Sequence, residues 1–305
     1  MTKLNQLVKS LLEEGKVTKV IGYKKSVKNN TKPYIAVTPN DADEMVFNTD
    51  CRNNLSVYLT KKEIMNGGKV GIVAKGCDIR NIIALIQENR LKKDDIFIIS
   101  AECKGVSAEK GSAVYANKCM SCSVKTPHLH DELVEMQGME LAEPKDNYSE
   151  IKEKLLTMTN EERFEFFTGM FSDCIKCYAC RQTCPMCYCE QCIADMSIPK
   201  WIESSATERG NLSWNMIRAF HLSGRCTGCN ECESACPAEI PLSLINRLMY
   251  ETVKEEFKYE SGMNIETPTL IGSYTLKDND NLFQKKKKKK NNKRKTNKTR
   301  QQLGK

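Results

Sequence analysis

Residues 69–100 read KVGIVAKGCDIRNIIALIQENRLKKDDIFIIS. Val70–Val73 is a short apolar run of the kind that forms a buried strand, and Ile96–Ile99 is a second one. Between them, apolar residues recur at helical spacing over Ile79–Arg90, with Asp78 as the expected N-cap. A strand, a helix and a strand joined by short links predict a right-handed parallel βαβ unit.

The residues before this unit extend the same pattern. Leucines at helical spacing predict a helix over residues 1–15. Short strands are expected at Lys19–Tyr23, Tyr34–Thr38 and Leu55–Leu59, separated by turn-rich segments. Residues 1–125 are therefore predicted to form a small α/β domain.

The strand signal fades after about residue 127, and helical spacing replaces it. Helices are predicted at His130–Glu140, Ser149–Thr159, Glu161–Phe171, Asn211–Leu222 and Leu242–Glu256. Residues 126–260 are accordingly predicted to form a helical domain. Residues 261–305 are predicted to be an irregular segment followed by a disordered Lys-rich tail, since such a tail has almost nothing to bury.

Two cysteine motifs lie in the helical half. They read CIKCYACRQTCP at 174–185 and CTGCNECESACP at 226–237, and both have the spacing C-x2-C-x2-C-x3-C-P. Three cysteines at this spacing let one tight loop supply three corners of a 4Fe-4S cubane, and in two-cluster ferredoxins the fourth cysteine ligates the other cluster. The spacing predicts one cluster on Cys174, Cys177, Cys180 and Cys236, and a second on Cys226, Cys229, Cys232 and Cys184.

The double motif resembles bacterial-type dicluster ferredoxin domains. Residues 186–225, between the motifs, are long and predicted to be mostly helical. In this respect the chain is more similar to the α-helical ferredoxin domain of heterodisulfide reductase and succinate dehydrogenase iron–sulfur subunits than to the compact β-hairpin ferredoxin. This resemblance covers about residues 174–248.

A broader resemblance spans about residues 15–250. It rests on GCDIRNIIALIQENRLKKDDIFIIS, CIKCYACRQTCPMCYCEQC and FHLSGRCTGCNECESACPAEIPL. Together these runs resemble beta-type electron-transfer subunits related to deazaflavin-coenzyme-reducing hydrogenase and formate dehydrogenase beta chains. The resemblance implies a catalytic partner subunit in a hydrogenase, formate dehydrogenase or heterodisulfide reductase complex. Some members bind FAD, but no G-x-G-x-x-G motif supports FAD in this chain.

Further cysteines allow a third 4Fe-4S cluster. Cys77 and Cys103 follow the two strands of the βαβ unit, so both are expected at the carboxyl edge of the sheet, where α/β folds bind ligands. The helix beginning there is expected to favour the thiolate form of Cys77. One grouping is Cys77, Cys103, Cys119 and Cys122. The other joins Cys119 and Cys122 to two of Cys187, Cys189 and Cys192. In the alternative interpretation Cys77 and Cys103 are buried structural thiols, as Cys51 is expected to be.

The distribution of charge and the cysteine content limit the classes of function that fit the sequence. The chain has 305 residues, 16 cysteines and a formal charge of +8, but residues 285–305 hold 12 Lys and Arg and no acid, so the remainder carries −4. The tail is either a native polycation or the product of a reading-frame change, and without interleaved aromatic residues it predicts no specific nucleic-acid binding. The sequence shows no signal peptide and no apolar run of membrane-spanning length, which predicts a cytoplasmic protein with reduced cysteines.

The favoured function is an iron–sulfur electron-transfer subunit, because no acid–base or nucleophilic constellation suggests a complete enzyme. Two alternatives stay open. One is a flavin-containing oxidoreductase subunit that exchanges hydride with a nicotinamide or deazaflavin coenzyme. The other is a zinc-stabilised interaction protein, although zinc–thiolate sites usually use separated C-x2-C pairs.

Overall fold

The computed structural model describes residues 2–274 except 28–29, 110, 121 and 144–146. The chain divides into a compact unit, Met1–Leu270, and the segment Ile271–Lys305. The compact unit includes both predicted domains, and their division at residue 125 stays a prediction. The Lys-rich tail lies outside the described residues.

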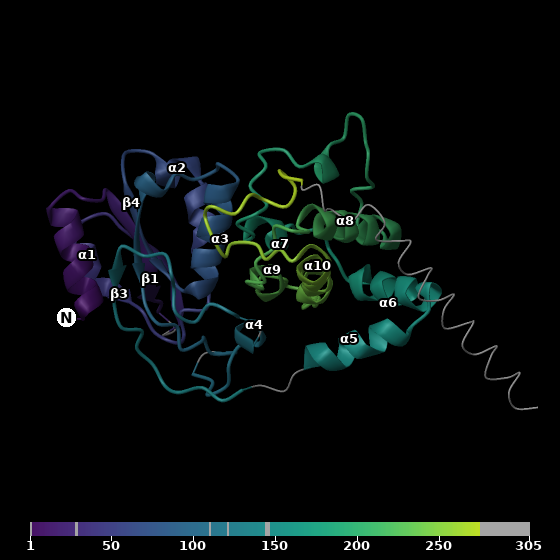
Figure 1. The fold of residues 1–305 in the computed structure, drawn as a ribbon, viewed down its shortest axis with the longest axis horizontal. Helices are drawn as coiled ribbons and strands as arrows, with labels where there is room; N and C mark the ends of the chain where they lie inside the picture. The colour runs from purple at the N-terminus through teal and green to yellow at the C-terminus, as the bar shows by residue number, and fades with distance from the viewer. Residues whose placement is uncertain (1, 28–29, 110, 121, 144–146, 275–305) are drawn as a thin grey trace, which may run out of the picture. The chain divides into compact units, whose positions relative to one another are not determined.

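A mostly parallel sheet forms the first half of the compact unit (Figure 1). Its strand order is β2-β1-β4-β5-β6, and β3 pairs with β1. Strands β1, β4, β5 and β6 run parallel, whereas β2 and β3 are antiparallel to β1. The strand bounds are β1 Lys19–Lys25, β2 Thr31–Ala36, β3 Met45–Val46, β4 Val70–Ala74, β5 Ile96–Ser100 and β6 Glu132–Leu133.

The predicted βαβ unit is confirmed. Helix α3 (Gly76–Gln87) connects β4 to β5, and the two strands are in register with Ile72 opposite Ile98. Every residue of β4 is buried, as are most residues of α3. The apolar runs that indicated these elements therefore form the centre of the sheet core.

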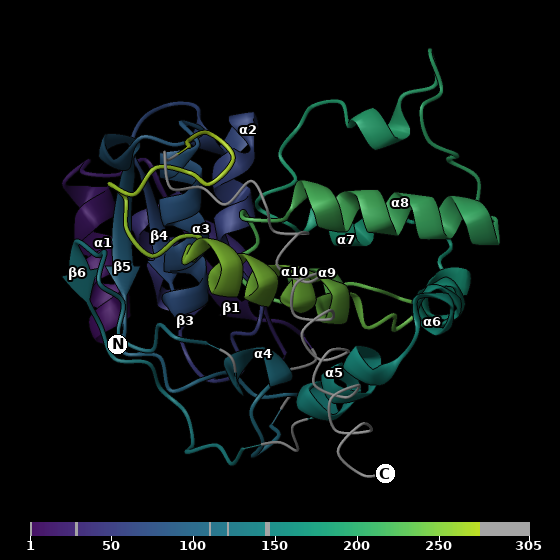
Figure 2. The same ribbon diagram turned by 45° about the vertical axis from the view of Figure 1, so that its right-hand side comes forward.

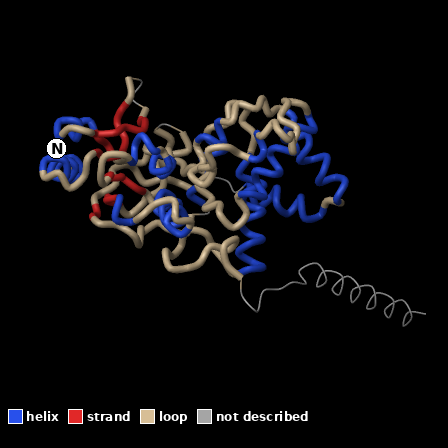
Figure 3. Tube along the Cα trace, turned by 90° about the horizontal axis from the view of Figure 1, so that it is seen from above, coloured by secondary structure: helices blue, strands red, loops and turns tan. Residues whose placement is uncertain are grey.

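Helices predominate after the sheet, in a region that Figure 3 shows apart from the strands. Their bounds, with those of the earlier helices, are α1 Lys3–Glu13, α2 Lys62–Met65, α4 Asn117–Met120, α5 Asn147–Thr157, α6 Asn160–Ser172, α7 Ala179–Gln182, α8 Glu208–His221, α9 Glu231–Ser234 and α10 Leu242–Phe257. Short 3-10 helices cover η1 Pro39–Glu44, η2 Ser56–Thr60, η3 Lys93–Asp95 and η4 Ile193–Asp195. A second, smaller core gathers around Phe171 and Trp214.

Three element predictions are wrong. Residues 186–225, expected to be mostly helical, contain η4 and α8, and the longer part of this stretch is loop and turn. The expected strand Leu55–Leu59 is replaced by η2, because the Asn54 side chain accepts the Ser56 N–H and the chain turns there. The expected helix His130–Glu140 is instead extended around β6. Here the Asp131 N–H donates to the Ile98 carbonyl, so pairing with the open edge of β5 prevails over helical spacing.

The start of α3 also differs from expectation. Lys75, not Asp78, is the N-cap, and Asp78 occupies the third helical position, from which its carboxylate accepts the Lys75 N–H. The glycine at position 76 is required by packing, since a Cβ there would lie 1.7 Å from the Val124 carbonyl oxygen. The backbone of residue 124 therefore closes directly over the first turn of α3.

Candidate metal centres

The first predicted cysteine set lies around one small cavity. Cys174, Cys177, Cys180 and Cys236 all line this space of about 20 Å³, together with Trp214 of α8. Cys177 is exposed, whereas Cys180 is buried. Burial raises the pKa of Cys180 to about 11, and the neighbouring thiols of the set add to the effect.

Both motifs have the same backbone turn around their middle cysteine. Lys176 and Tyr178 flank Cys177 with φ of 55° and 59°, and Gly228 and Asn230 flank the middle cysteine of the second motif with φ of 74° and 57°. Left-handed residues on either side turn the loop sharply. This turn lets three closely spaced cysteines face one point, which is what a cubane requires.

The second predicted set also gathers. Burial raises the pKa values of Cys226, Cys229 and Cys232 to about 12, and Cys184 is close enough to each of them to raise these values further. The two motifs lie against each other, as the predicted exchange of their fourth cysteines requires. Helix α7, which precedes Cys184, packs against α9, which precedes Cys236 (Figure 2).

The CYCEQC cysteines separate from one another. The thiols of Cys184 and Cys187 interact closely, which lowers the pKa of Cys184 and raises that of Cys187. Cys189 is exposed. Cys192 packs against the second core. Cys187 therefore lies beside the second set, an arrangement that the motif spacing did not predict.

The first grouping for a third site surrounds a single cavity of about 210 Å³. Cys77, Cys103, Cys119 and Cys122 line this cavity, and Cys229 of the second set lines it as well. None of the CYCEQC cysteines is among the lining residues. The two strands of the βαβ unit do bring Cys77 and Cys103 to one edge of the sheet.

The environment of Cys77 corrects one expectation. Burial raises the pKa of Cys77 well above its ordinary value, and the nearby Asp78 carboxylate adds to the rise. The helix N-terminus therefore does not produce a thiolate there. A flavin phosphate does not fit at this turn either, because the backbone of Val124 covers Gly76 and the Asp78 carboxylate already occupies the first turn of the helix.

Two buried lysines border the third cavity, and no sequence motif indicated either of them. Lys75 lies 3.1 Å from Asp78 and also donates to the Asn53 carbonyl and the Tyr23 hydroxyl. Burial opposes the charge of Lys75, but Asp78 and Cys77 outweigh it and raise the pKa of Lys75. Lys75 is thus a buried cation beside the cavity.

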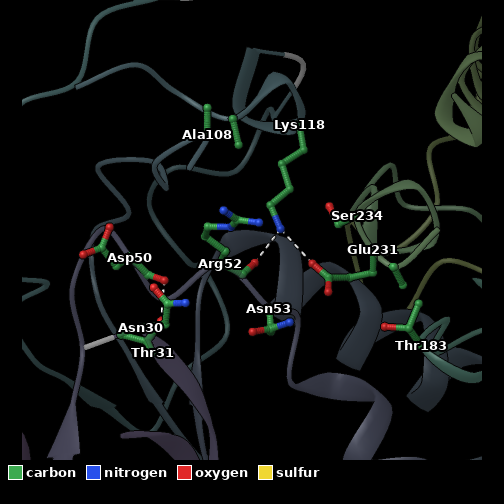
Figure 4. Close-up of a pocket in the computed structure, with 12 residues that line it drawn as sticks. Asn30, Thr31, Asp50, Arg52, Asn53, Ala108, Lys118, Thr183, Glu231 and Ser234 are labelled. Carbon is green, nitrogen blue, oxygen red and sulfur yellow. Dashed lines mark hydrogen bonds and ion pairs between the residues drawn. The ribbon is translucent and has the colours of Figure 1, made fainter. Parts of the chain in front are cut away.

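Lys118 joins the two halves of the compact unit. Its Nζ lies 2.7 Å from the Glu231 carboxylate of α9 and donates to the Arg52 carbonyl, as Figure 4 shows. The pair lies between the third cavity, which Lys118 lines, and a polar cavity of about 410 Å³ that both residues line. The only sequence signal for this residue was its position directly before Cys119.

The chemistry of these donor sets fits iron–sulfur clusters. Each set consists of four cysteines, and buried cations lie beside the third cavity, where a cluster with four thiolates would carry negative charge. Among the described residues, no group of three or more His, Cys, Asp or Glu side chains is arranged to bind a single metal ion. A 4Fe-4S cubane is larger than a single metal ion, so its four thiolate ligands lie farther apart than the ligands of one ion do.

Replacing Asp78 with asparagine should strongly destabilise the sheet half. The change leaves Lys75 buried without its carboxylate partner, which costs about 3–5 kcal/mol when a buried pair is broken. The expected result is a corresponding fall in the free energy of unfolding in urea. The control is Glu44→Gln, which breaks the partly exposed pair with Lys24 and should cost no more than about 1 kcal/mol. Equal losses in the two variants would contradict a buried pair at Lys75.

The fold and the sites together define an α/β protein in which four cysteines line one small cavity and further cysteines line a second, larger one. No protein-family model matches the chain. It is similar to the F420-dependent formate dehydrogenase subunit beta of Methanocaldococcus jannaschii, at 24% identity over 66% of this chain and 76% of the relative. It is also similar to the F420-dependent formate dehydrogenase 1 subunit beta of Methanococcus maripaludis, at 21% identity over 87% of this chain and 92% of the relative. In the part of the chain that is described, no helix is long and apolar enough to cross a membrane.

Proposed function

We propose that this chain is an iron–sulfur electron-transfer subunit of an anaerobic redox complex. The observation that carries the proposal is the gathering of Cys174, Cys177, Cys180 and Cys236 around one cavity. The fourth member comes from the other motif, as ligation in two-cluster ferredoxins requires. When bound, such clusters accept and release single electrons.

The arrangement of the sets supports a path through the chain. Cys177 of the first set is exposed, so that set reaches the surface. The thiol of Cys180 in the first set acts electrostatically on that of Cys232 in the second set. Cys229 of the second set also lines the third cavity. We therefore propose three sites in sequence, from the surface to the carboxyl edge of the sheet.

The thiols themselves support loading by metal with release of protons. Burial keeps most of them protonated at neutral pH, as the raised pKa values of Cys226, Cys229 and Cys232 illustrate. Metal binding requires the thiolate, so assembly at these positions releases protons to solvent. Assembly should therefore proceed more readily as pH rises, because less work is then needed to deprotonate each thiol.

The partner is proposed to be the catalytic subunit of a formate dehydrogenase, hydrogenase or heterodisulfide reductase complex. Both relatives are named as formate dehydrogenase beta subunits, and they favour the first of these. Their names also describe them as F420-dependent. We infer that electrons in this chain pass between a formate-oxidising subunit and a deazaflavin-type carrier.

Metal analysis of the anaerobically purified chain tests the proposal. We expect about eight irons with matching acid-labile sulfide if the two motif sets are loaded, and about twelve if the third set is loaded too. The same sample is assayed for zinc and flavin. Zinc in place of iron, with no acid-labile sulfide, would overturn the proposal and favour a zinc-stabilised protein.

A further inference from the structure

Arg218 lies on α8 between the two motif sets. The polar face of α8 holds the first motif in place, since Asn211 donates to the Cys174 carbonyl and Arg218 Nη2 donates to the Cys180 carbonyl at 3.0 Å. Arg218 is only 6% exposed. Its guanidinium is within electrostatic reach of Cys232, Cys184, Cys187 and Cys180.

The charge of Arg218 lacks the compensation that other buried cations have. Lys75 is paired with Asp78, and Lys118 with Glu231. Among the described residues, no carboxylate forms an ion pair with Arg218, and its Nε has no hydrogen-bond partner. An unpaired buried charge is strongly unfavourable. Its position among cysteines indicates that the compensating charge comes from metal-bound thiolates.

We propose that Arg218 sets the reduction potentials of the two motif clusters by placing one buried positive charge between them. This inference rests on the proposed function. A cluster held by four thiolates is anionic, and it gains one further negative charge on accepting an electron. The guanidinium stabilises the reduced form more than the oxidised form, so it raises both potentials.

The effect should be unequal at the two clusters. Cys232 and Cys184 of the second set act on the Arg218 guanidinium more strongly than Cys180 of the first set does. The side chain also contacts the first set through a backbone carbonyl and not through a thiol. Loss of the charge should therefore lower the potential of the second cluster more than that of the first.

Three variants separate charge from structure. Arg218→Met removes the charge and keeps the bulk, Arg218→Gln keeps a donor for the Cys180 carbonyl, and Arg218→Lys keeps the charge. The readout is the midpoint potential of each cluster, from anaerobic redox titration followed by electron paramagnetic resonance. The control is Arg163→Met on α6, where the guanidinium instead bonds the carbonyls of Leu155 and Met158.

For the Met and Gln variants we expect at least a tenfold fall in the one-electron equilibrium constant of the second cluster, which is about 59 mV. A smaller fall is expected at the first cluster. Arg218→Lys should lower the potential of the second cluster by less than half as much as Arg218→Met does. Arg163→Met should change neither potential. The proposal would be overturned if the Met and Gln variants kept full iron and unchanged potentials. It would also be overturned if Arg218→Lys lowered the potential of the second cluster as far as Arg218→Met does.

Iron content decides the remaining outcomes. If the neutral variants lose iron while Arg218→Lys keeps both iron and potentials, the requirement for charge is supported. If Arg218→Lys also loses iron, Arg218 is a structural residue and the proposal fails. Absence of iron from the wild-type chain would instead refute the proposed function, so the two failures are distinguishable.

Discussion

Cys180→Ala and Cys184→Ala should each remove a different cluster, although the two residues are four positions apart. Cys180 lies with Cys174, Cys177 and Cys236 around the first cavity. Cys184 instead acts on the three cysteines of the second motif. Each variant is expected to lose about four irons per chain and one of the two resonance signals. The measurement is iron content with electron paramagnetic resonance of the dithionite-reduced protein.

The experiment at Cys184 needs one added variant. The Cys187 N–H donates to the Cys184 carbonyl and the two thiols interact, so the Cys187 thiol is near enough to replace the missing ligand. The Cys184 change is therefore also made in a Cys187→Ala background, and Cys187→Ala alone should retain both signals. The assignment of ligands would be wrong if Cys180→Ala and the double variant abolished the same signal.

Cys77→Ala should remove the third site and leave the motif clusters intact. Cys77 lines the cavity of about 210 Å³ together with Cys103, Cys119 and Cys122. Without one of four thiolates the site should lose about four irons per chain. The resonance signals of the two motif clusters should persist. The measurement is iron and sulfide content of chains purified anaerobically in parallel.

Cys51 provides the matched control for this change. It is another cysteine of the sheet half, but it is buried, its sulfur accepts the Asn48 N–H, and it does not line the cavity. Cys51→Ala should lower stability without changing iron content. If Cys77→Ala likewise left the iron content unchanged, Cys77 would be a structural thiol, and the cavity would not be a cluster site.

Much of the architecture was predictable because local pattern and tertiary packing agree. The run Val70–Ala74 is apolar throughout and forms a fully buried strand. The helix predicted at Glu161–Phe171 corresponds to α6, whose Thr159 N-cap forms a capping box with Glu162. The spacing of the cysteines in the two motifs also pointed to Cys174, Cys177, Cys180 and Cys236, which line one cavity, and their role as cluster ligands stays a prediction.

Predictions were wrong where a distant partner outweighed local spacing. Residues 130–140 have helical spacing, but the open edge of β5 offers backbone hydrogen bonds that draw this segment into the sheet. Cys77 does lie at a helix N-terminus. However, burial and the neighbouring Asp78 carboxylate raise the pKa of the thiol.

By itself the sequence determined the βαβ unit, because that unit depends on spacing along a short stretch of chain. The membership of the two motif sets stays a prediction from the cysteine spacing. Only the tertiary structure placed Cys77 and Cys103 with Cys119 and Cys122 around one cavity. Only the tertiary structure placed Arg218 between the motif sets and paired Lys118 with Glu231, 113 residues away. Such contacts depend on how helices and loops pack across long sequence separations, and residue spacing within one segment carries no record of that packing.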